Sequence, residues 1–425
     1  MREAGSRPAF PASGLYRGQI NETDAMKKFS ALFQVIFEQA IFTLSFFCTQ
    51  TLLARYLSVT GFASFSAVYS AVILLNIIHG CTVMEPLLVF SKSDHVLSKS
   101  LLLQLHAPLA LASIPVTIYL VMHIPNAPPY FILALVFSLA GFIAYWTVRS
   151  IAILENKSLK SVLPALSQFA GVCLAIALIP KDSPYQLNEV LIFLGLPLLL
   201  ASGMISGGRA PKTAPLSGAS PESPPWLSFG LNNTFSQILV WAMTHGLVIF
   251  YMSRQQADLA ANFRVVMTLV LPAQYLNIAI SNYQLPKLSR LAEERSTQFS
   301  VMARTFILVT LGCSLLYSLL LWAAGESLVG LLFGAKYAGL NMRDYVLFPF
   351  IFAAIQGGRT ILKALRLTHH ASWAVAIGFL FFLFAFLLNS HRSINNVLLP
   401  TVFGLGAASV IMFYQIKKNL KAIHL

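Results

Sequence analysis

The chain has 425 residues, of which 57% are hydrophobic and only 10% are charged, and its mean hydropathy is +0.72. Because a soluble domain carries about 25% charged residues, this composition excludes a soluble enzyme, a nucleic-acid-binding module and a disulfide-rich secreted domain. The formal net charge of +14 then reports membrane topology, since basic residues gather in cytoplasmic loops. A spanning helix needs about 20 apolar residues, so the length allows about ten to fourteen spans.

The first half of the chain predicts six spans. Residues 1–25 are polar and lack the basic-then-apolar order of a secretory signal peptide, so we expect a disordered tail or an overcalled start before Met26. Apolar runs then predict an N-terminal lobe over residues 26–206, with helices at Phe29–Leu53, Gly61–Met84, Leu101–Ile124, Tyr130–Thr147, Val162–Ile179 and Val190–Ile205.

The second half repeats this organisation. Residues 207–225 are rich in Gly, Pro, Ser and Ala and predict a cytoplasmic linker. A C-terminal lobe over residues 226–425 follows, with helices at Trp226–Ser253, Val265–Leu285, Thr305–Gly325, Tyr345–Leu362, Ala371–Ser390 and Ser393–Ile416. The predicted fold is an all-α polytopic membrane protein, in which twelve transmembrane helices form two six-helix lobes around a central cavity.

The distribution of charges tests this count independently. Twelve spans place both termini on one side of the membrane, and with both ends in the cytoplasm 22 of the 29 Lys and Arg residues fall on the inner side. One span more or fewer would scramble this asymmetry. The segments Phe65–Val72 (FSAVYSAV) and Phe263–Val270 (FRVVMTLV) align at an offset of 198 residues. We therefore expect parallel repeats, related by an axis along the membrane normal.

Two helix junctions resemble those of a known transporter family. The run Thr51–Ser66 (TLLARYLSVTGFASFS) is similar to the junction of the first two helices in polysaccharide flippases of the O-antigen, Wzx-type family, a branch of the multidrug/oligosaccharidyl-lipid/polysaccharide exporter superfamily. The run Phe250–Arg264 (FYMSRQQADLAANFR), followed by Leu285–Arg290, resembles the matching junction in the second half. Ala257 begins that helix where the family usually has a Gly.

The resemblance implies a function as well as a fold. Members of this family are V-shaped inverting transporters, which move undecaprenyl-pyrophosphate-linked oligosaccharides from the cytoplasmic to the periplasmic leaflet of the bacterial inner membrane. The expected partners are such a lipid-linked glycan, membrane lipids and a coupling cation, proton or sodium, with no cofactor and no nucleic acid. Because flipping needs no covalent chemistry, we expect no enzymatic activity.

Charged residues inside the predicted spans are the candidate site residues, because each costs at least about 2.5–3.5 kcal/mol on insertion scales. Glu38 lies near mid-membrane and is either an ion-coupling carboxylate, a partner for a cavity cation, or a paired residue that locks helix packing. Arg264 is either a cavity guanidinium that binds the lipid pyrophosphate or an arginine snorkelling to the outer headgroups. Arg359 either meets the pyrophosphate first or anchors its helix in the cytoplasmic interface, as we expect of Arg149.

Polar residues without charge add further candidates. Asn232 and Asn233 begin the seventh predicted helix and could bond either sugar hydroxyls or neighbouring helices. The four cysteines lie inside apolar runs as small hydrophobes, and His79, His106 and His245 have no metal-ligand spacing, so we predict no metal site.

Two other functions remain as alternatives. A multidrug cation antiporter of the same superfamily would favour acidic cavity residues, of which Glu38 is the candidate. A membrane polysaccharide polymerase would need a large outward loop, and the longest one here, Glu326–Asp344, is short.

Overall fold

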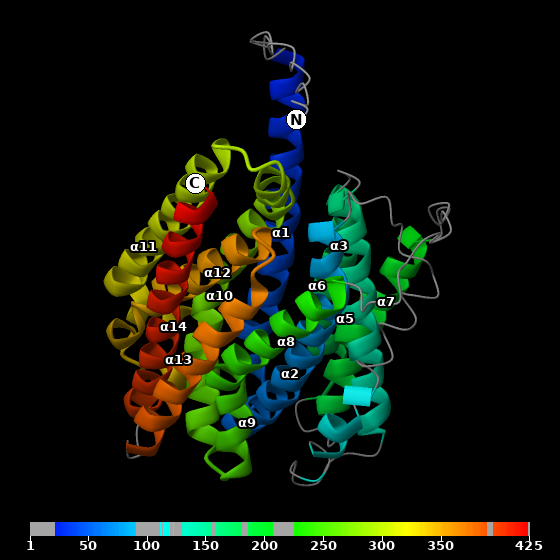
Figure 1. Cartoon of the computed structure of the whole chain (residues 1–425). Coiled ribbons are helices and arrows are strands. Elements are labelled where there is room, and N and C mark those ends of the chain that lie inside the picture. Colours follow the sequence, from blue (N-terminus) through cyan, green and yellow to red (C-terminus); the bar gives the residue numbers. More distant parts are fainter. Residues whose placement is uncertain are drawn as a thin grey trace, which may run out of the picture.

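The protein is a bundle of helices (Figure 1). This computed structural model describes residues 22–90, 111–112, 114–119, 122, 130–154, 158–180, 186–206, 225–388 and 394–423. The helices of the first half are α1 Glu22–Tyr56, α2 Val59–His79, the π-helical turn η1 Gly80–Met84, α3 Glu85–Phe90, α5 Phe131–Leu154, the 3₁₀ turn η2 Ser158–Ser161, α6 Val162–Leu178 and α7 Gln186–Ser206. Those of the second half are α8 Pro225–Met243, α9 His245–Ser253, α10 Ala257–Glu293, α11 Gln298–Phe333, the 3₁₀ turns η3 Ala335–Tyr337 and η4 Met342–Tyr345, α12 Phe348–Ala364, α13 Thr368–Leu388 and α14 Ile394–Ile423.

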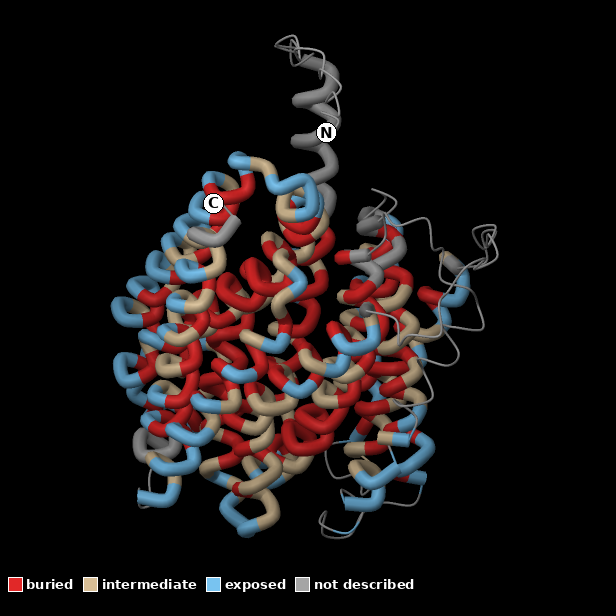
Figure 2. The backbone as a smooth tube through the Cα atoms, viewed as in Figure 1, coloured by how far each residue is buried: buried red, intermediate tan, exposed pale blue. Residues whose placement is uncertain are grey.

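The surface has the character of a membrane protein. Within the described residues, eight helices are long and apolar enough to cross a bilayer, and a ninth is added if the bent pair α8 and α9 counts as one span. Large apolar side chains such as Leu308, Leu316 and Trp322 are exposed on α11, while the buried segments are concentrated inside the bundle (Figure 2). A helix pairs its own backbone N–H and C=O groups, and it must do so in a bilayer because hydrocarbon offers no hydrogen-bonding partner. The protein is a multi-pass integral membrane protein.

Each predicted span outside Leu101–Ile124 coincides with a helix, although several boundaries differ. Leu101–Ile124 falls for the most part outside the described residues, as do residues 1–21 and 207–224. The α1 helix begins at Glu22, inside the predicted tail, and α10 and α11 extend beyond the predicted apolar runs at both ends. The N- and C-terminal ends lie at the same end of the bundle (Figure 1), as an even number of spans requires.

Close helix crossings depend on glycine. In the first half, a Cβ added at Gly195 of α7 would lie 2.3 Å from the Cα of Ser138 on α5. In the second half, a Cβ added at Gly378 of α13 would lie 2.4 Å from the carbonyl oxygen of Gly404 on α14. Small residues let transmembrane backbones approach this closely, so these crossings fix the outer parts of the bundle against which the central helices pack.

Two helices are irregular at mid-length. The α2 helix passes through the π turn Gly80–Met84 before α3, and π turns often occur at functional sites. The predicted span Trp226–Ser253 is broken at Thr244 into α8 and α9, which meet at an angle of 51°. Both irregularities border the central cavity, so they reorient the side chains that line it.

Candidate functional site

A cavity of about 270 Å³ lies between helices of the two halves. The first half contributes α1, α2, η1, α3 and α5, and the second half contributes α8, α9, α10 and α12. Much of the wall is aromatic, with Phe42, Phe46, Tyr69, Phe142, Trp146, Trp241, Tyr275 and Phe352. Its charged lining residues are Glu85, Arg149 and Arg359.

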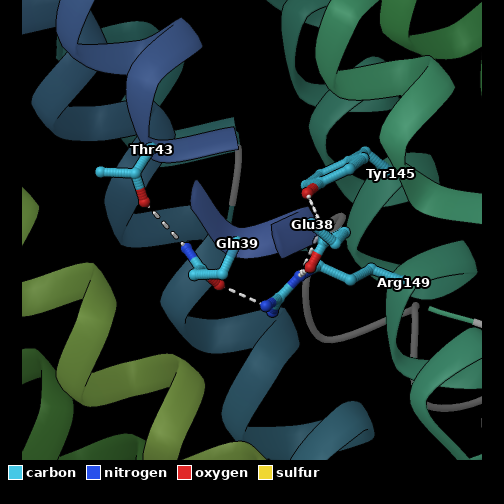
Figure 3. A network of polar contacts seen from close by, with 5 residues as sticks. All are labelled: Glu38, Gln39, Thr43, Tyr145 and Arg149. Carbon is cyan, nitrogen blue, oxygen red and sulfur yellow. Dashed lines mark hydrogen bonds and ion pairs between the residues drawn. The ribbon is translucent and has the colours of Figure 1, made fainter. Parts of the chain in front are cut away.

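Glu38 is fully paired inside the first half (Figure 3). Nε of Arg149 lies 2.8 Å and 3.0 Å from the two carboxylate oxygens of Glu38, and the hydroxyl of Tyr145 donates to the same carboxylate at 2.6 Å. Gln39 accepts a further hydrogen bond from Arg149 and donates to Thr43 at 3.2 Å. Both ionised groups are buried, so each charge is neutralised where water cannot screen it.

This pairing corrects the expectation for Arg149. The sequence suggested an anchor at the cytoplasmic interface, but the side chain is buried and lines the cavity with its guanidinium 5.0 Å from the ring centroid of Trp146. Glu38 is a paired carboxylate, which fits both a partner for a cavity cation and a residue that locks the packing of α1 against α5.

Arg359 belongs to a second buried cluster, which we call the inner cluster: Glu85, Asn233, Arg359 and Lys363. Arg359 donates to the Asn233 amide oxygen at 2.7 Å, and Asn233 in turn donates to Glu85. Lys363 lies 2.7 Å from the same carboxylate. Arg359 and Lys363 are one turn apart on α12, so Lys363 reaches the Glu85 carboxylate directly and Arg359 reaches it through Asn233.

The inner cluster holds two cations against one carboxylate. Arg359 and Lys363 are both almost fully buried, and Nε of Arg359 has no hydrogen-bond partner. An interface anchor would leave its charge in water, so the anchor alternative for Arg359 does not describe this side chain.

Arg264 is the centre of a third group, the outer cluster: Gln50, Tyr69, His245 and Arg264. Nε of Arg264 donates to the Gln50 amide oxygen at 3.1 Å, and Nη1 lies 3.3 Å from Nδ1 of His245. Its guanidinium carbon lies 4.6 Å from the ring centroid of Tyr69. Because Arg264 can only donate, the imidazole accepts through Nδ1 and is neutral.

The charge of Arg264 is uncompensated. The side chain is fully buried, which excludes snorkelling to the headgroups, and among the described residues no Asp or Glu forms an ion pair with it. Nη2 of Arg264 and Nε2 of Gln50 are buried donors without a partner. A buried guanidinium cannot lose its proton to escape this cost, so the outer cluster keeps a buried positive charge that an anion could neutralise.

The remaining predicted residue lies apart from the cavity. Asn232 donates to the Ser228 carbonyl of its own helix at 2.9 Å, whereas its neighbour Asn233 faces the inner cluster. Sequence reasoning missed Gln50 and Tyr69 as site residues, whereas the turn-by-turn spacing of Arg359 and Lys363 had already indicated a common basic stripe. The signal that could have paired Glu38 with Arg149 was their opposite charge in separate spans of one half.

Comparison with known proteins identifies the fold. No family model matches the chain, and no curated protein matches its sequence. Among solved structures, a mutant of the MATE transporter VcmN of Vibrio cholerae has a TM-score of 0.67 at 16% identity and covers 94% of this chain and 98% of that one. The eukaryotic MATE transporter AtDTX14 has a TM-score of 0.65 at 12% identity and covers 92% and 96%.

A third structure links the fold to a wider group. It is an outward-facing multidrug resistance MATE family transporter of the MOP superfamily, with a TM-score of 0.59 at 15% identity, covering 94% of this chain and 96% of that chain. The chain has the MATE fold. The predicted all-α polytopic architecture of twelve transmembrane helices in two lobes around a cavity is thereby confirmed.

Proposed function

We propose that the protein is a transporter that flips an undecaprenyl-pyrophosphate-linked oligosaccharide across the bacterial inner membrane by alternating access. The observation that carries this proposal is the fully buried Arg264, which has two adjacent unpaired donors and no carboxylate. A diphosphate supplies the negative charge and acceptor oxygens that such a site lacks. Arg359 and Asn233 contribute from the inner cluster, and the aromatic walls offer apolar faces to sugar rings.

The lipid part of this cargo also has a place to lie. An apolar groove of about 620 Å³ runs between α2, α9 and α13 and is lined by residues that include Ala71, Leu247, Phe250 and Phe386. Trp241 lines both the groove and the cavity and donates from its indole to the Ser70 carbonyl at 2.8 Å. A cargo with a charged headgroup and a polyprenyl tail fits a cavity with the charged residues Glu85, Arg149 and Arg359 beside an apolar groove.

In this proposal, residues 26–206 and 226–425 are the two lobes that rock around the cavity, with both termini in the cytoplasm. Glu38 is the ion-coupling residue, since a cation or proton on its carboxylate would compete with Arg149 and alter the contact between α1 and α5.

A second candidate, the multidrug cation antiporter, is favoured by the description of one similar structure as a multidrug resistance transporter. A cationic drug needs a free acid in the cavity. Glu85, which lines the cavity, is held by Lys363, and Glu38 is held by the lining residue Arg149, so both described acids are already neutralised. We therefore prefer the anionic cargo.

Purified protein reconstituted in liposomes tests the two candidates directly. One arm follows protein-dependent flipping of a fluorescent polyprenyl-diphosphate oligosaccharide, and the other follows pH- or sodium-driven uptake of a cationic dye. We expect flipping of the lipid, its loss in Arg264→Ala, and unchanged flipping in the matched control Arg254→Ala, which removes an exposed arginine nearby. Dye uptake without lipid flipping would replace the flippase with the antiporter.

A further inference from the structure

We infer that the protein has two separate binding stations for phosphate-type anions, one at the inner cluster and one at the outer cluster, of which Tyr69 and His245 line the cavity, and that a headgroup occupies them in succession. This inference rests on the proposed function and deepens it. It assigns Arg359 and Arg264 to two separate sites. Anion binding at the outer cluster can therefore be measured by itself.

Three helices independently give the distance between the stations. On α1, Glu38 and Gln50 are twelve positions apart; on α2 and η1, Tyr69 and Cys81 are twelve apart; on α8 and α9, Asn233 and His245 are twelve apart. In the first and third pairs one residue contacts Arg264 and the other contacts Arg149 or Arg359; in the second, Tyr69 contacts Arg264 and Cys81 lines the cavity together with Arg359. Along the continuous α1, twelve residues rise about 18 Å, whereas the π turn and the 51° bend shorten the separation in the other two pairs.

That distance is too long for a single headgroup. A diphosphate extends over only a few bond lengths, which is much less than the rise between Glu38 and Gln50 on α1. Arg149 lies at the depth of the inner cluster, as its contact with Glu38 requires.

The charges at each station point to the same chemistry. In the inner cluster, Glu85 neutralises one of the two cations Arg359 and Lys363, and Arg149 is cancelled by Glu38. One positive charge remains there, and one remains at Arg264. Each station also keeps unpaired donors: Nε of Arg359 at the inner cluster, and Nη2 of Arg264 with Nε2 of Gln50 at the outer. An unpaired buried charge is costly, so a phosphate oxygen would complete either station.

The interval between the stations is aromatic. Phe46 lies 5.5 Å from Tyr69 and 6.2 Å from Tyr275, measured between ring centroids, and all three line the cavity. An anion gains little binding free energy among these rings. It therefore passes from one station to the other in a discrete step. The outer station adjoins the apolar groove, because Gly246 of the groove follows His245 directly. A lipid-linked anion would thus reach the outer station with its tail beside it.

Equilibrium dialysis of radiolabelled inorganic pyrophosphate against the purified full chain tests the inference. We expect roughly two bound molecules per wild-type chain, and about one in either Arg264→Gln or Arg359→Gln. The double variant should bind none, and the exposed control Arg254→Gln should bind as the wild type does. Arg264→Lys keeps the charge, so it should retain the outer site with weaker affinity, which guards against misfolding of the glutamine variant.

The outcomes separate this inference from the proposed function. A single site that either variant abolishes, or no binding to the wild type, would overturn the two stations even if the lipid is flipped. Two sites without any lipid flipping would preserve the stations and reject the flippase. In an added arm, polyprenyl diphosphate competes with the labelled pyrophosphate. Displacement of pyrophosphate from both sites supports a lipid headgroup as the ligand, whereas displacement by inorganic phosphate but not by the lipid would overturn the lipid headgroup as the ligand.

Discussion

Two buried arginines of this protein have opposite surroundings. Arg149, in the first half, has a carboxylate, an amide and a tyrosine-supported hydrogen-bond network around it. Arg264, in the second half, is equally buried but has an amide, a neutral imidazole and an aromatic face. The difference separates a charge that the fold pairs with a carboxylate from one that it leaves without a carboxylate among the described residues. Substitutions at the two positions should therefore have opposite effects on stability.

The largest expected effect is at Glu38. Glu38→Ala leaves Arg149 buried and unpaired, and breaking a buried ion pair by removing one partner costs about 3–5 kcal/mol. We expect the free energy of unfolding in mixed micelles to fall by this amount. The double variant Glu38→Leu with Arg149→Met should recover most of the loss, because it removes both charges. A Glu38→Ala variant as stable as the wild type would mean that the pair is not a buried one.

Arg264→Met should give the reverse result. Replacing an unpaired buried guanidinium with an apolar side chain removes desolvated donors, so we expect a gain of about 1–3 kcal/mol in the free energy of unfolding. Lipid flipping should be lost at the same time. The exposed control Arg254→Met should stay within about 0.5 kcal/mol of the wild type. If Arg264→Met is destabilised as strongly as Glu38→Ala, a partner for Arg264 exists in the protein itself.

The contrast between these arginines was only half visible in the sequence. Apolar runs predict the helices because hydrocarbon admits few other structures, and the cost of a buried charge marks Glu38, Arg264 and Arg359 as candidates. Which charges meet depends on the depth and rotation of helices far apart in the chain. Glu38 and Arg149 are 111 residues apart, so their pairing follows from packing alone.

The irregularities of α2 and of the α8–α9 pair could not be predicted from the sequence for a related reason. The break at Thr244 contains no proline, yet it determines where His245 points. The π turn Gly80–Met84 likewise changes the phase of α3 relative to α2. The neighbouring residues Asn232 and Asn233 could be separated into a helix-facing and a cavity-facing amide only once the rotation of α8 was known.

An intermediate effect is expected at Glu85, whose side chain is 21% exposed. Glu85→Gln keeps the shape but leaves Arg359 and Lys363 without a carboxylate, so we expect a loss of about 1–3 kcal/mol in unfolding free energy. Pyrophosphate affinity at the inner station should rise about tenfold, equivalent to about 1.4 kcal/mol. Dialysis against Arg264→Gln, in which only the inner station binds, measures this rise. Weaker binding would show that Glu85 supports the anion site instead of competing with it.

The smallest expected effect concerns exposed cations that join the two halves at the opposite end of the bundle from the termini. Lys336 donates to the carbonyls of Arg55 and Leu57 at 3.2 Å and 2.6 Å, and Arg55 donates to the Leu332 carbonyl at 2.7 Å. Each cation thus caps the carbonyl end of a helix in the other half, which favours positive charge.

Because such exposed contacts contribute less than about 1 kcal/mol, Lys336→Gln should barely change the free energy of unfolding. It should nevertheless favour conformations in which these helix ends are apart, since the contact exists only when the halves meet there. Spin-label distances between the halves would record a larger open population in Lys336→Gln than in the wild type, with the exposed Arg254→Gln as control. An unchanged distance distribution would confine the role of charge in this protein to its buried cavity.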